Sequence, residues 1–570
     1  MATSTQAGSR APREEFTRNF QKTVQLASGQ TVRIDHRHGD IVIRTHAQRE
    51  VNINANIRVS ADNREDAARF GNQIEIQLDH SAGSLSIRTK YPEMERISFV
   101  GSLFFRHNIS YSVRYDIVMP EDTPLNIHNS FGSVSVSGAK RGADITNAHG
   151  LLIFRDGRGS VQLENSFAGI ELTGNAGDVS LTNSNGPVTA EHVDGSLSLR
   201  NRFGKIRVSK VSKAATIVNS NGEVQLQDAG AGSSISNSFG PVRALNITGG
   251  LTVNNSNGAV EARNISGAAE LSTTFATITV FDVRRRLSCN ATNGNVTASK
   301  VGETATVRNT FGLVDLRDIG GYTEIDNRNG KIFVRDIRGS ALLKTSFGEV
   351  DASAISGNAS VSNQNAAIKI NSVTGSAEVH SAYGLIDVSG IRKDARIVAG
   401  NSNVSLADVA GPAYVKTSFG LVKAQRIGGS LTVESSNGSV NAWDVKGAAN
   451  IRTSFGSATL DDVDGAVDVY NQNGAIEVSG IAPNAAGSQR CNSISLRTSF
   501  APIRISVPEN GSFNVTARTS FGKITSELPL TVSGLVSGDS LTGKIGSGAC
   551  ELRLTNGNGA IEIRKAVGRR

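Results

Sequence analysis

Short stretches of this chain alternate apolar and polar residues, and a turn interrupts them about every nine positions. Residues 196–200 read Ser-Leu-Ser-Leu-Arg, and residues 205–209 read Lys-Ile-Arg-Val-Ser. Period-two alternation rich in Val, Ile and Leu predicts short strands with one buried face. A step of this length leaves roughly five residues for the strand and four for the turn, which is close to the usual strand length.

Superimposed on these strands, positions spaced 18 residues apart alternate between an aromatic residue and an asparagine. The aromatic positions are Phe131, Phe167, Phe203, Phe239, Phe275, Phe311, Phe347, Tyr383, Phe419 and Phe455. The asparagine positions are Asn185, Asn221, Asn257, Asn293, Asn329, Asn365, Asn401, Asn437 and Asn473, with His149 as the exception in the series. Repetition at a short fixed period predicts an array built from one stacked unit.

Glycine marks the turns of this repeat twice. It follows most of the aromatic and asparagine positions, giving Ser-Phe-Gly and Ser-Asn-Gly in turn, and it recurs half a period away, for example at Gly195 and Gly267. Asn-Gly provides positive φ at low steric cost and therefore makes a tight corner.

The large number of short strands limits the architectures into which they can fold. A single open sheet would leave a whole apolar face in water, and a propeller would need more blades than propellers normally have. We therefore predict an all-β fold, a parallel β-helix or β-solenoid of 18-residue repeats with a 36-residue superperiod and β caps at both ends. Coils of 18 or of 36 residues both fit, and we favour 36 because it stacks Phe on Phe and Asn on Asn.

The repeat also divides the chain. Residues 1–22 are predicted to be a disordered leader, and 23–118 an N-terminal β-rich cap with one short helix at residues 62–70. Residues 119–482 form the regular solenoid, and 483–570 form irregular coils and a C-terminal cap, where Ser-Phe motifs recur out of phase at Phe500 and Phe521. Caps are expected because a solenoid must protect its open edge strands.

The N-terminal strands followed by repeated Asn-Ser-Phe-Gly and Asn-Ser-Asn-Gly units resemble the bacterial putative-adhesin repeat domains, a family of uncharacterised β-solenoids. The resemblance covers roughly residues 23–570 and is best over 119–480. It implies a setting in the cell envelope or at the cell surface and brings no catalytic residues with it.

Composition adds little to this picture. The three cysteines, Cys289, Cys491 and Cys550, are widely spaced and are expected to be small buried residues without a disulfide framework. The formal charge of +8 is dispersed over polar positions, so no nucleic-acid partner is expected. No transmembrane segment and no signal peptide is recognised, which keeps a cytoplasmic location open.

Candidate sites were weighed against ordinary structural roles. The aromatic side chains are expected to plug the inside of their corners, and an exposed ladder that stacks on sugars is the alternative. The asparagines are expected to make turns and to hydrogen-bond within their own stack. A metal held by His36 and His38 is considered and set aside, and the recurring acids Asp318, Asp336, Asp408, Asp444 and Asp462 are interpreted as solvated turn positions.

The sequence thus predicts a non-enzymatic, adhesin-like structural or binding protein that presents a repetitive solenoid surface and needs no cofactor or metal. An intracellular or periplasmic self-assembling scaffold is the alternative, and a polysaccharide-active β-helix enzyme is the third possibility. No ligand is identified; surface polysaccharide or another envelope component is the partner class considered.

Overall fold

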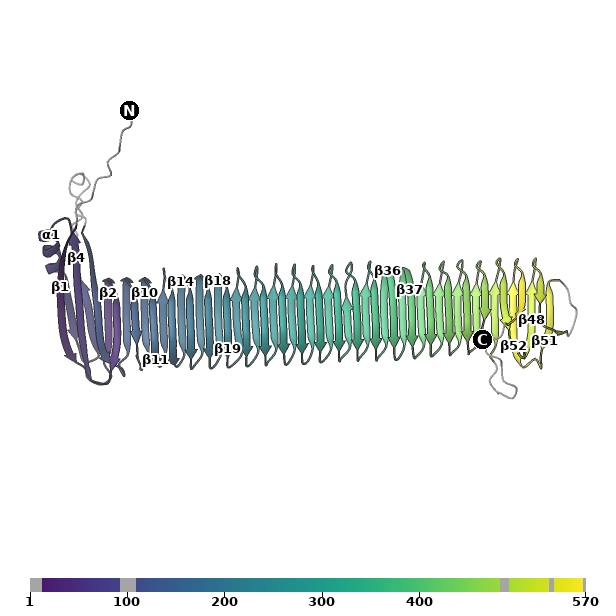
Figure 1. Ribbon diagram of the computed structural model, residues 1–570, viewed down its shortest axis with the longest axis horizontal. Coiled ribbons are helices and arrows are strands. Elements are labelled where there is room, and N and C mark those ends of the chain that lie inside the picture. Colours follow the sequence, from purple (N-terminus) through teal and green to yellow (C-terminus); the bar gives the residue numbers. More distant parts are fainter. Residues whose placement is uncertain (1–12, 93–108, 482–491, 533–537, 567–570) are drawn as a thin grey trace, which may run out of the picture. The chain divides into compact units, whose positions relative to one another are not determined.

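The computed structural model describes residues 13–92, 109–481, 492–532 and 538–566. The chain divides into two compact units, unit 1 over Met1–Thr273 and unit 2 over Thr274–Arg570. Each unit is a parallel β-solenoid, in which most strands pair with the strand two places further along the chain (Figure 1). The all-β solenoid fold that the repeat predicts is therefore confirmed.

One coil of the solenoid contains 18 residues and two strands. Ile145 pairs with Leu163 on the next coil, and Leu163 pairs with Leu181 on the coil after that. The preference for a 36-residue coil was therefore wrong. Two strands joined by two tight corners already close a coil, and the 36-residue period arises only because corner residues alternate from one coil to the next.

The strands form two stacks. Strands of stack A lie just before the corner that carries the ring or asparagine of each repeat, as β16 (Leu197–Phe203) lies before the corner at Phe203. Strands of stack B lie just after that corner. In spatial order, stack A of unit 1 consists of β5 (Glu75–His80), β6 (Ser84–Lys90), β2 (Thr31–His38), β8 (Leu125–Phe131), β10 (Ala143–His149), β12 (Val161–Asn165), β14 (Val179–Asn185), β16 (Leu197–Phe203), β18 (Ala215–Asn221), β20 (Ser233–Asn237), β22 (Leu251–Asn255) and β24 (Ala269–Thr273). Stack B of unit 1 consists of β1 (Glu14–Gln25), β4 (Glu50–Ala61), β7 (Ser110–Pro120), β3 (Ile41–His46), β9 (Val134–Ser137), β11 (Leu152–Arg158), β13 (Ile170–Ala176), β15 (Val188–Val193), β17 (Ile206–Val211), β19 (Val224–Ala229), β21 (Val242–Ile247) and β23 (Val260–Ile265).

Unit 2 repeats this arrangement. Its stack A contains β26 (Leu287–Ala291), β28 (Ala305–Asn309), β30 (Thr323–Asn327), β32 (Ala341–Lys344), β34 (Ala359–Asn363), β38 (Ala413–Thr417), β40 (Leu431–Ser435), β42 (Ala449–Thr453), β44 (Val467–Asn471), β46 (Ile494–Thr498), β52 (Cys550–Asn556), β48 (Phe513–Thr519), β51 (Ser540–Ile545) and β50 (Thr531–Val532). Its stack B contains β25 (Ile278–Val283), β27 (Val296–Val301), β29 (Val314–Ile319), β31 (Ile332–Ile337), β33 (Val350–Ile355), β35 (Ile368–Val373), β39 (Val422–Ile427), β41 (Val440–Val445), β43 (Ala458–Val463), β45 (Ile476–Ser479), β47 (Ile503–Val507), β53 (Ile561–Lys565) and β49 (Ile524–Ser526). Between β34 and β38, β36 (Ala377–Ile391) and β37 (Ala395–Val409) each run through both stacks.

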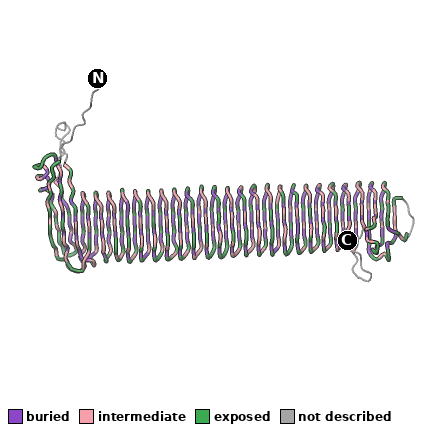
Figure 2. The backbone as a smooth tube through the Cα atoms, in the orientation of Figure 1, coloured by how far each residue is buried: buried purple, intermediate pink, exposed green. Residues whose placement is uncertain are grey.

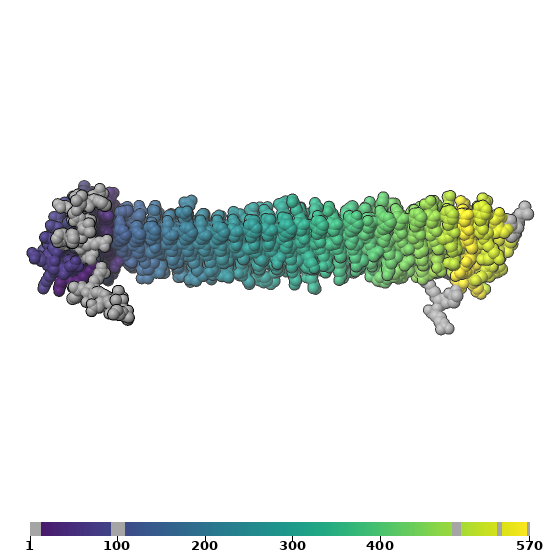
Figure 3. Space-filling view, turned by 90° about the horizontal axis from the view of Figure 1, so that it is seen from above, coloured from purple at the N-terminus to yellow at the C-terminus, as the bar shows by residue number. Residues whose placement is uncertain are grey.

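The core of each unit is a continuous column of aliphatic side chains. Along each strand the inward positions are buried and the outward positions are exposed, so that buried and accessible residues alternate on every coil (Figure 2). Leu199 and Val208, for example, are at most 1% exposed on the two strands of one coil. Val, Ile, Leu and Ala dominate this column, and coils of each unit pack closely side by side (Figure 3).

The glycines of the second corner are required by close approach between coils. A Cβ added to Gly195 would collide with the carbonyl group of Gly177 on the preceding coil, and one added to Gly267 would collide with Gly249. The second glycine column therefore reflects backbone-to-backbone contact between coils, which leaves no room for a side chain.

The N-terminal end of unit 1 changes from parallel to antiparallel pairing. β5 pairs antiparallel with β6, and β1 and β4 pair antiparallel with each other and with β7. The helix α1 (Arg64–Gln73) begins two residues later than predicted. Its N-cap is Asn63, whose side chain accepts a hydrogen bond from the Asp66 backbone amide. Glu14–Gln25 form β1, so the predicted disorder was wrong for residues 14–22, while residues 1–12 lie outside the described residues.

The C-terminal end of unit 2 stacks its coils out of chain order. β46 pairs with β52, and β52 pairs on its other side with β48, so the chain's last coil lies between two earlier ones. β51 then pairs antiparallel with β48, and β50 with β51. The predicted insert at 483–488 lies outside the described residues.

Candidate functional site: the ring–amide ridge

Within each unit, the aromatic and asparagine positions share one corner column, between stack A and stack B, and alternate along it. Asn185 pairs with Phe203, and Phe203 pairs with Asn221. In unit 2, Tyr383 pairs with Asn401, which bridges to Phe419. The expected stacking of Phe on Phe was therefore wrong, because coils of 18 residues place unlike residues on neighbouring coils.

We call this column the ring–amide ridge of each unit. In unit 1 it contains His38, Phe131, His149, Phe167, Asn185, Phe203, Asn221, Phe239 and Asn257. In unit 2 it contains Phe275, Asn293, Phe311, Asn329, Phe347, Asn365, Tyr383, Asn401, Phe419, Asn437, Phe455, Asn473, Phe500, Asn558 and Phe521.

The rings of the ridge face solvent. From Phe131 to Phe455 the ten aromatic side chains are 43% to 64% exposed. The expectation that they plug the inside of the corner was wrong. The residue two positions earlier, such as Asn201 before Phe203, already fills that space and is 6% exposed. The chain then turns at the following glycine, and the ring is left outside.

The rings stack on their neighbours along the ridge. His38 and Phe131 have ring centroids 5.1 Å apart, Phe131 and His149 4.6 Å, and His149 and Phe167 4.4 Å, with planes within 6° of parallel. Successive coils lie ~4.8 Å apart, which is the spacing of such a stack. The flat faces of these rings are therefore covered by the next coil, and their edges meet solvent.

The asparagines of the ridge are fixed by the preceding coil. Asn185 Nδ2 donates to the Ser166 carbonyl at 3.1 Å, and Asn365 Nδ2 donates to the Ser346 carbonyl, also at 3.1 Å. Asn257 makes the same bond to Ser238 at 3.2 Å. The expectation that the asparagines bond within their own stack was wrong, because asparagines lie on alternate coils and these three bond to the backbone of the neighbouring ring coil. The bonds hold these amides in one position beside the ring coil.

A second, buried ladder lies two residues before the ridge and was missed in the sequence. Asn165 Nδ2 donates to the carbonyls of Gly150 and Gly169 at 3.0 and 2.9 Å. Where threonine replaces asparagine, as at Thr345, its hydroxyl donates to the Gly330 carbonyl of the preceding coil at 3.1 Å. The repeated Asn in Asn-Ser-Phe-Gly is the signal that could have revealed this ladder.

Rings and asparagines also alternate at the C-terminal end of unit 2, where the coils are not stacked in the order of the chain. By the strand register of unit 2, Phe500 lies over Asn473, Asn558 over Phe500, and Phe521 over Asn558. The backbone N–H of Asn558 donates to the Ser499 carbonyl at 2.7 Å, as that of Asn473 does to Ser454, and the Asn558 Nδ2 donates to the same Ser499 carbonyl at 3.2 Å. Phe500 follows Asn473 by 27 residues instead of 18, and the later change of phase at Phe521 is a consequence of the reordered coils.

The two histidines once considered as metal ligands have different roles. His38 occupies an amide position of the ridge, and like His149 it is followed by a glycine. His36 is buried, its Nδ1 lies 3.0 Å from Thr89 Oγ1, and burial lowers the pKa of its imidazole to about 4. Among the described residues, no three His, Cys, Asp or Glu side chains gather in a way that could hold a metal ion.

The recurring acids lie at the other corner, at the end of the stack B strands. The backbone there is left-handed on almost every coil, with φ of 53° at Asp318, 54° at Asp408 and 56° at Asp444. Asp and Asn tolerate this conformation better than most residues, which explains why they recur. The interpretation as turn positions holds, and the left-handed backbone is what the sequence alone did not reveal.

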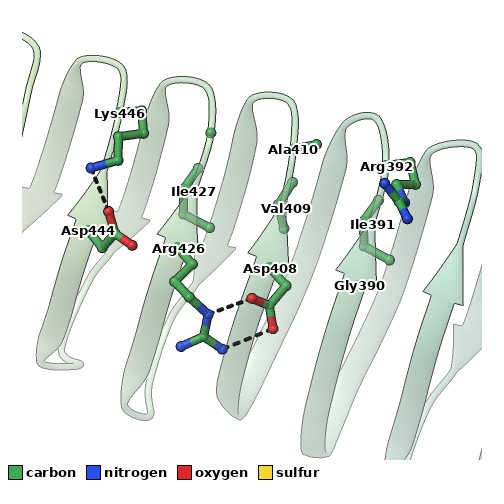
Figure 4. Close-up of a pocket in the computed structure, with 11 residues that line it drawn as sticks. Gly390, Ile391, Arg392, Asp408, Val409, Ala410, Arg426, Ile427, Asp444 and Lys446 are labelled. Atoms are coloured by element: carbon green, nitrogen blue, oxygen red, sulfur yellow. Dashed lines mark hydrogen bonds and ion pairs between the residues drawn. The ribbon is translucent and has the colours of Figure 1, made fainter.

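An open groove of about 470 Å³ follows this corner in unit 2 (Figure 4). Asp408 accepts two hydrogen bonds from Arg426, one of them at 2.9 Å, and Asp444 pairs with Lys446 at 2.8 Å. The Arg426 guanidinium lowers the pKa of the Asp408 carboxyl below its usual value. The groove carries acids that are already ion-paired, and it offers no pair of free carboxylates.

The cysteines differ from expectation in one respect. Cys289 is free and buried, and burial raises the pKa of its thiol to about 12. Cys550 is also buried, but it is disulfide-bonded. Cys491 lies outside the described residues. The expectation of small buried cysteines without a disulfide therefore holds for Cys289 and fails for Cys550.

Comparison with known proteins gives one family. Residues 379–564 match the family model described as Toastrack DUF4097, which covers about a third of the chain. A solved structure of a putative cell adhesion protein from Clostridium sporogenes matches with 8% identity and a TM-score of 0.15, over 43% of this chain and 100% of that one. This similarity is too low to support an inference about the chain. A search of curated proteins gives no match. Over residues 379–564 the chain is therefore similar to the Toastrack DUF4097 family, and the resemblance to uncharacterised, adhesin-like β-solenoids is confirmed.

Proposed function

We propose that this protein is a non-enzymatic, adhesin-like binding protein of the cell envelope, and that the ring–amide ridge is its binding surface. The observation that carries the proposal is the exposure of ten aromatic side chains, 43% to 64% each, which gather in the ridge column of each unit. Exposed apolar side chains that gather in one place are typical of interaction sites, whereas single exposed residues need no explanation.

The disulfide at Cys550 supports a location outside the reducing cytosol. Disulfides persist in secreted and periplasmic proteins and are rare in cytosolic ones. No helix among the described residues is long and apolar enough to cross a membrane.

Two other functions have less support. A scaffold that polymerises end to end needs open parallel edges. Antiparallel strands end the parallel pairing in both stacks of unit 1, with β5 in stack A and β4 and β1 in stack B, and in stack A of unit 2, with β51. Such strands protect an edge against further stacking. A polysaccharide-active enzyme needs paired carboxylates at a groove, and Asp408 and Asp444 are instead bound to basic side chains.

The test is protease shaving of intact cells that express the chain, followed by fractionation and detection with an antibody to the repeats. Loss of the signal from intact cells supports the proposal, and full protection until lysis contradicts the envelope location. Purified chain is then bound to envelope fragments from cells that lack it. A ridge variant with Phe311, Phe347 and Phe419 changed to Asn is expected to lose this binding, and unchanged binding would show that the ridge is not the surface used.

A further inference from the structure

We propose that the partner of the ridge is a second copy of this chain, bound ridge to ridge, so that adhesion is homophilic. This inference rests on the proposed function and specifies its partner. It follows from the orientation of the rings, the alternation of large and small residues, the small uncharged residues beside them, and the exposed area.

The orientation of the rings argues against sugars as the partner. A sugar stacks on the open face of an aromatic ring. Where ring contacts are defined in unit 1, the planes of Phe131, His149 and Phe167 are parallel within 3° and their faces cover one another. Elsewhere an asparagine lies on each neighbouring coil, ~4.8 Å away. The ridge therefore presents ring edges, which suit the packing of side chains from another protein.

The alternation makes the ridge complementary to itself. A large ring projects on every second coil, ~9.6 Å apart, and a shorter amide leaves a notch between each two rings. A second ridge shifted by one coil places its rings over these notches. A two-fold axis that passes between a ring coil and an amide coil produces this arrangement for both copies at once, as a symmetric dimer requires.

The neighbours of the ridge allow close approach. Each ridge position from Phe131 to Asn473 is followed by Gly, Ala or Ser, and the preceding residue is charged only at Arg202 and Arg328. The notch itself is rigid, because Asn365 Nδ2 is held by the Ser346 carbonyl at 3.1 Å. Little desolvation of charge and little ordering of side chains therefore oppose association.

The exposed area is sufficient for a stable interface. Unit 2 carries eight ridge rings, from Phe275 to Phe521, each at least half exposed. A ring side chain can bury ~150–250 Å², so half-exposed rings in this number offer on the order of 800 Å² per partner. Stable interfaces bury about this much on each side.

The test compares full-length chains by sedimentation over a series of concentrations. The natural chain is expected to dimerise or to form larger assemblies. The ridge variant F311N/F347N/F419N is expected to raise the dissociation constant at least about tenfold. Asn occupies the same corner on alternate coils, so this variant is expected to keep the fold, which circular dichroism checks.

The matched control removes exposed aromatic residues of the same unit that lie off the ridge. Phe281, Tyr322 and Trp443 are 37%, 41% and 36% exposed, and F281S/Y322S/W443S is expected to associate like the natural chain. The inference is overturned if the natural chain stays monomeric throughout, if the ridge variant still associates, or if the control loses association equally.

Envelope binding separates this inference from the proposed function. If the natural chain is monomeric but binds envelope fragments through the ridge, homophilic pairing is wrong and the proposed function stands. If the chain pairs through its ridge but is protected from protease on intact cells, the pairing stands and the envelope location is wrong. Beads coated with the natural chain should cluster, and beads coated with the ridge variant should not.

Discussion

The buried asparagine ladder provides a sharp test of what holds neighbouring coils together. Asn309 is 4% exposed, and its Nδ2 donates to the Gly294 carbonyl at 3.0 Å and to the Phe311 carbonyl at 2.8 Å. The first bond joins two coils and the second closes the ridge corner. Its Oδ1 accepts no hydrogen bond from the described residues. Replacement of Asn309 therefore removes two hydrogen bonds that its side chain donates and none that its side chain accepts.

The chain itself shows which replacement keeps half of this arrangement. At the equivalent position, Thr345 donates to the Gly330 carbonyl of the preceding coil at 3.1 Å. Asn309→Thr is therefore expected to keep the bond between coils and to cost ~1 kcal/mol, the net value of one hydrogen bond. Asn309→Ala loses both bonds and leaves buried carbonyls unpaired, which is expected to cost ~2–3 kcal/mol.

Hydrogen exchange is the suitable assay, because repeat arrays do not unfold as one two-state unit. In full-length protein, amides of residues 305–320 should exchange about fivefold faster in Asn309→Thr and on the order of a hundredfold faster in Asn309→Ala. Asn293→Ala, which changes an exposed ridge amide one coil earlier, is the control and should have a small effect. Equal exchange rates in the Thr and Ala variants would refute the assignment of the bond between coils.

Further predictions concern other parts of the chain. Phe311 is 50% exposed, so Phe311→Ala should lower local stability, measured by hydrogen exchange, by ~1 kcal/mol. Leu316 is fully buried, so Leu316→Ala should lower it by ~2–5 kcal/mol. Equal losses would contradict the exposed ridge. Burial lowers the pKa of the His36 imidazole in the folded state to about 4, below its ordinary value of about 6.5, so the unfolded state binds more protons between these values. Melting of the N-terminal strands should therefore be independent of pH above about 7 and lose ~3 kcal/mol as the pH falls to about 4, and His36→Leu should remove that dependence. Asp408 has a φ of 54°, in the left-handed region. Asp408→Gly should therefore leave the thermal stability of unit 2 within about 1 kcal/mol, and Asp408→Val should lower it by ~1–2 kcal/mol. A larger loss for glycine than for valine would contradict a left-handed corner. Reduction of the disulfide at Cys550 should cost ~2–5 kcal/mol in the C-terminal coils, seen as faster exchange of β52 and β48 but not of β28.

The reordered C-terminal coils keep the alternation along the ridge. The coil of Asn558 lies between those of Phe500 and Phe521, and this position restores the alternation that the chain order breaks. Unit 1 departs from the alternation, since His38, Phe131, His149 and Phe167 form a run of rings that stack at the coil spacing.

The sequence by itself determined the local structure and the class of fold. Alternation of residues such as Leu197, Leu199, Ile206 and Val208 with polar neighbours reports directly which side chains lie inside, because a strand has a period of two. Glycine at the corners reports where a side chain does not fit. These are properties of single residues and their near neighbours, so the sequence contains them.

Only the tertiary structure decided what depends on contacts between coils. Whether Phe203 lies over another ring or over Asn221 follows from the coil length, which strand pairing sets. The exposure of the ring follows from Asn201, which takes the inside of the corner first. The place of β52 between β46 and β48 joins strands more than thirty residues apart, and no local pattern in the sequence encodes that choice.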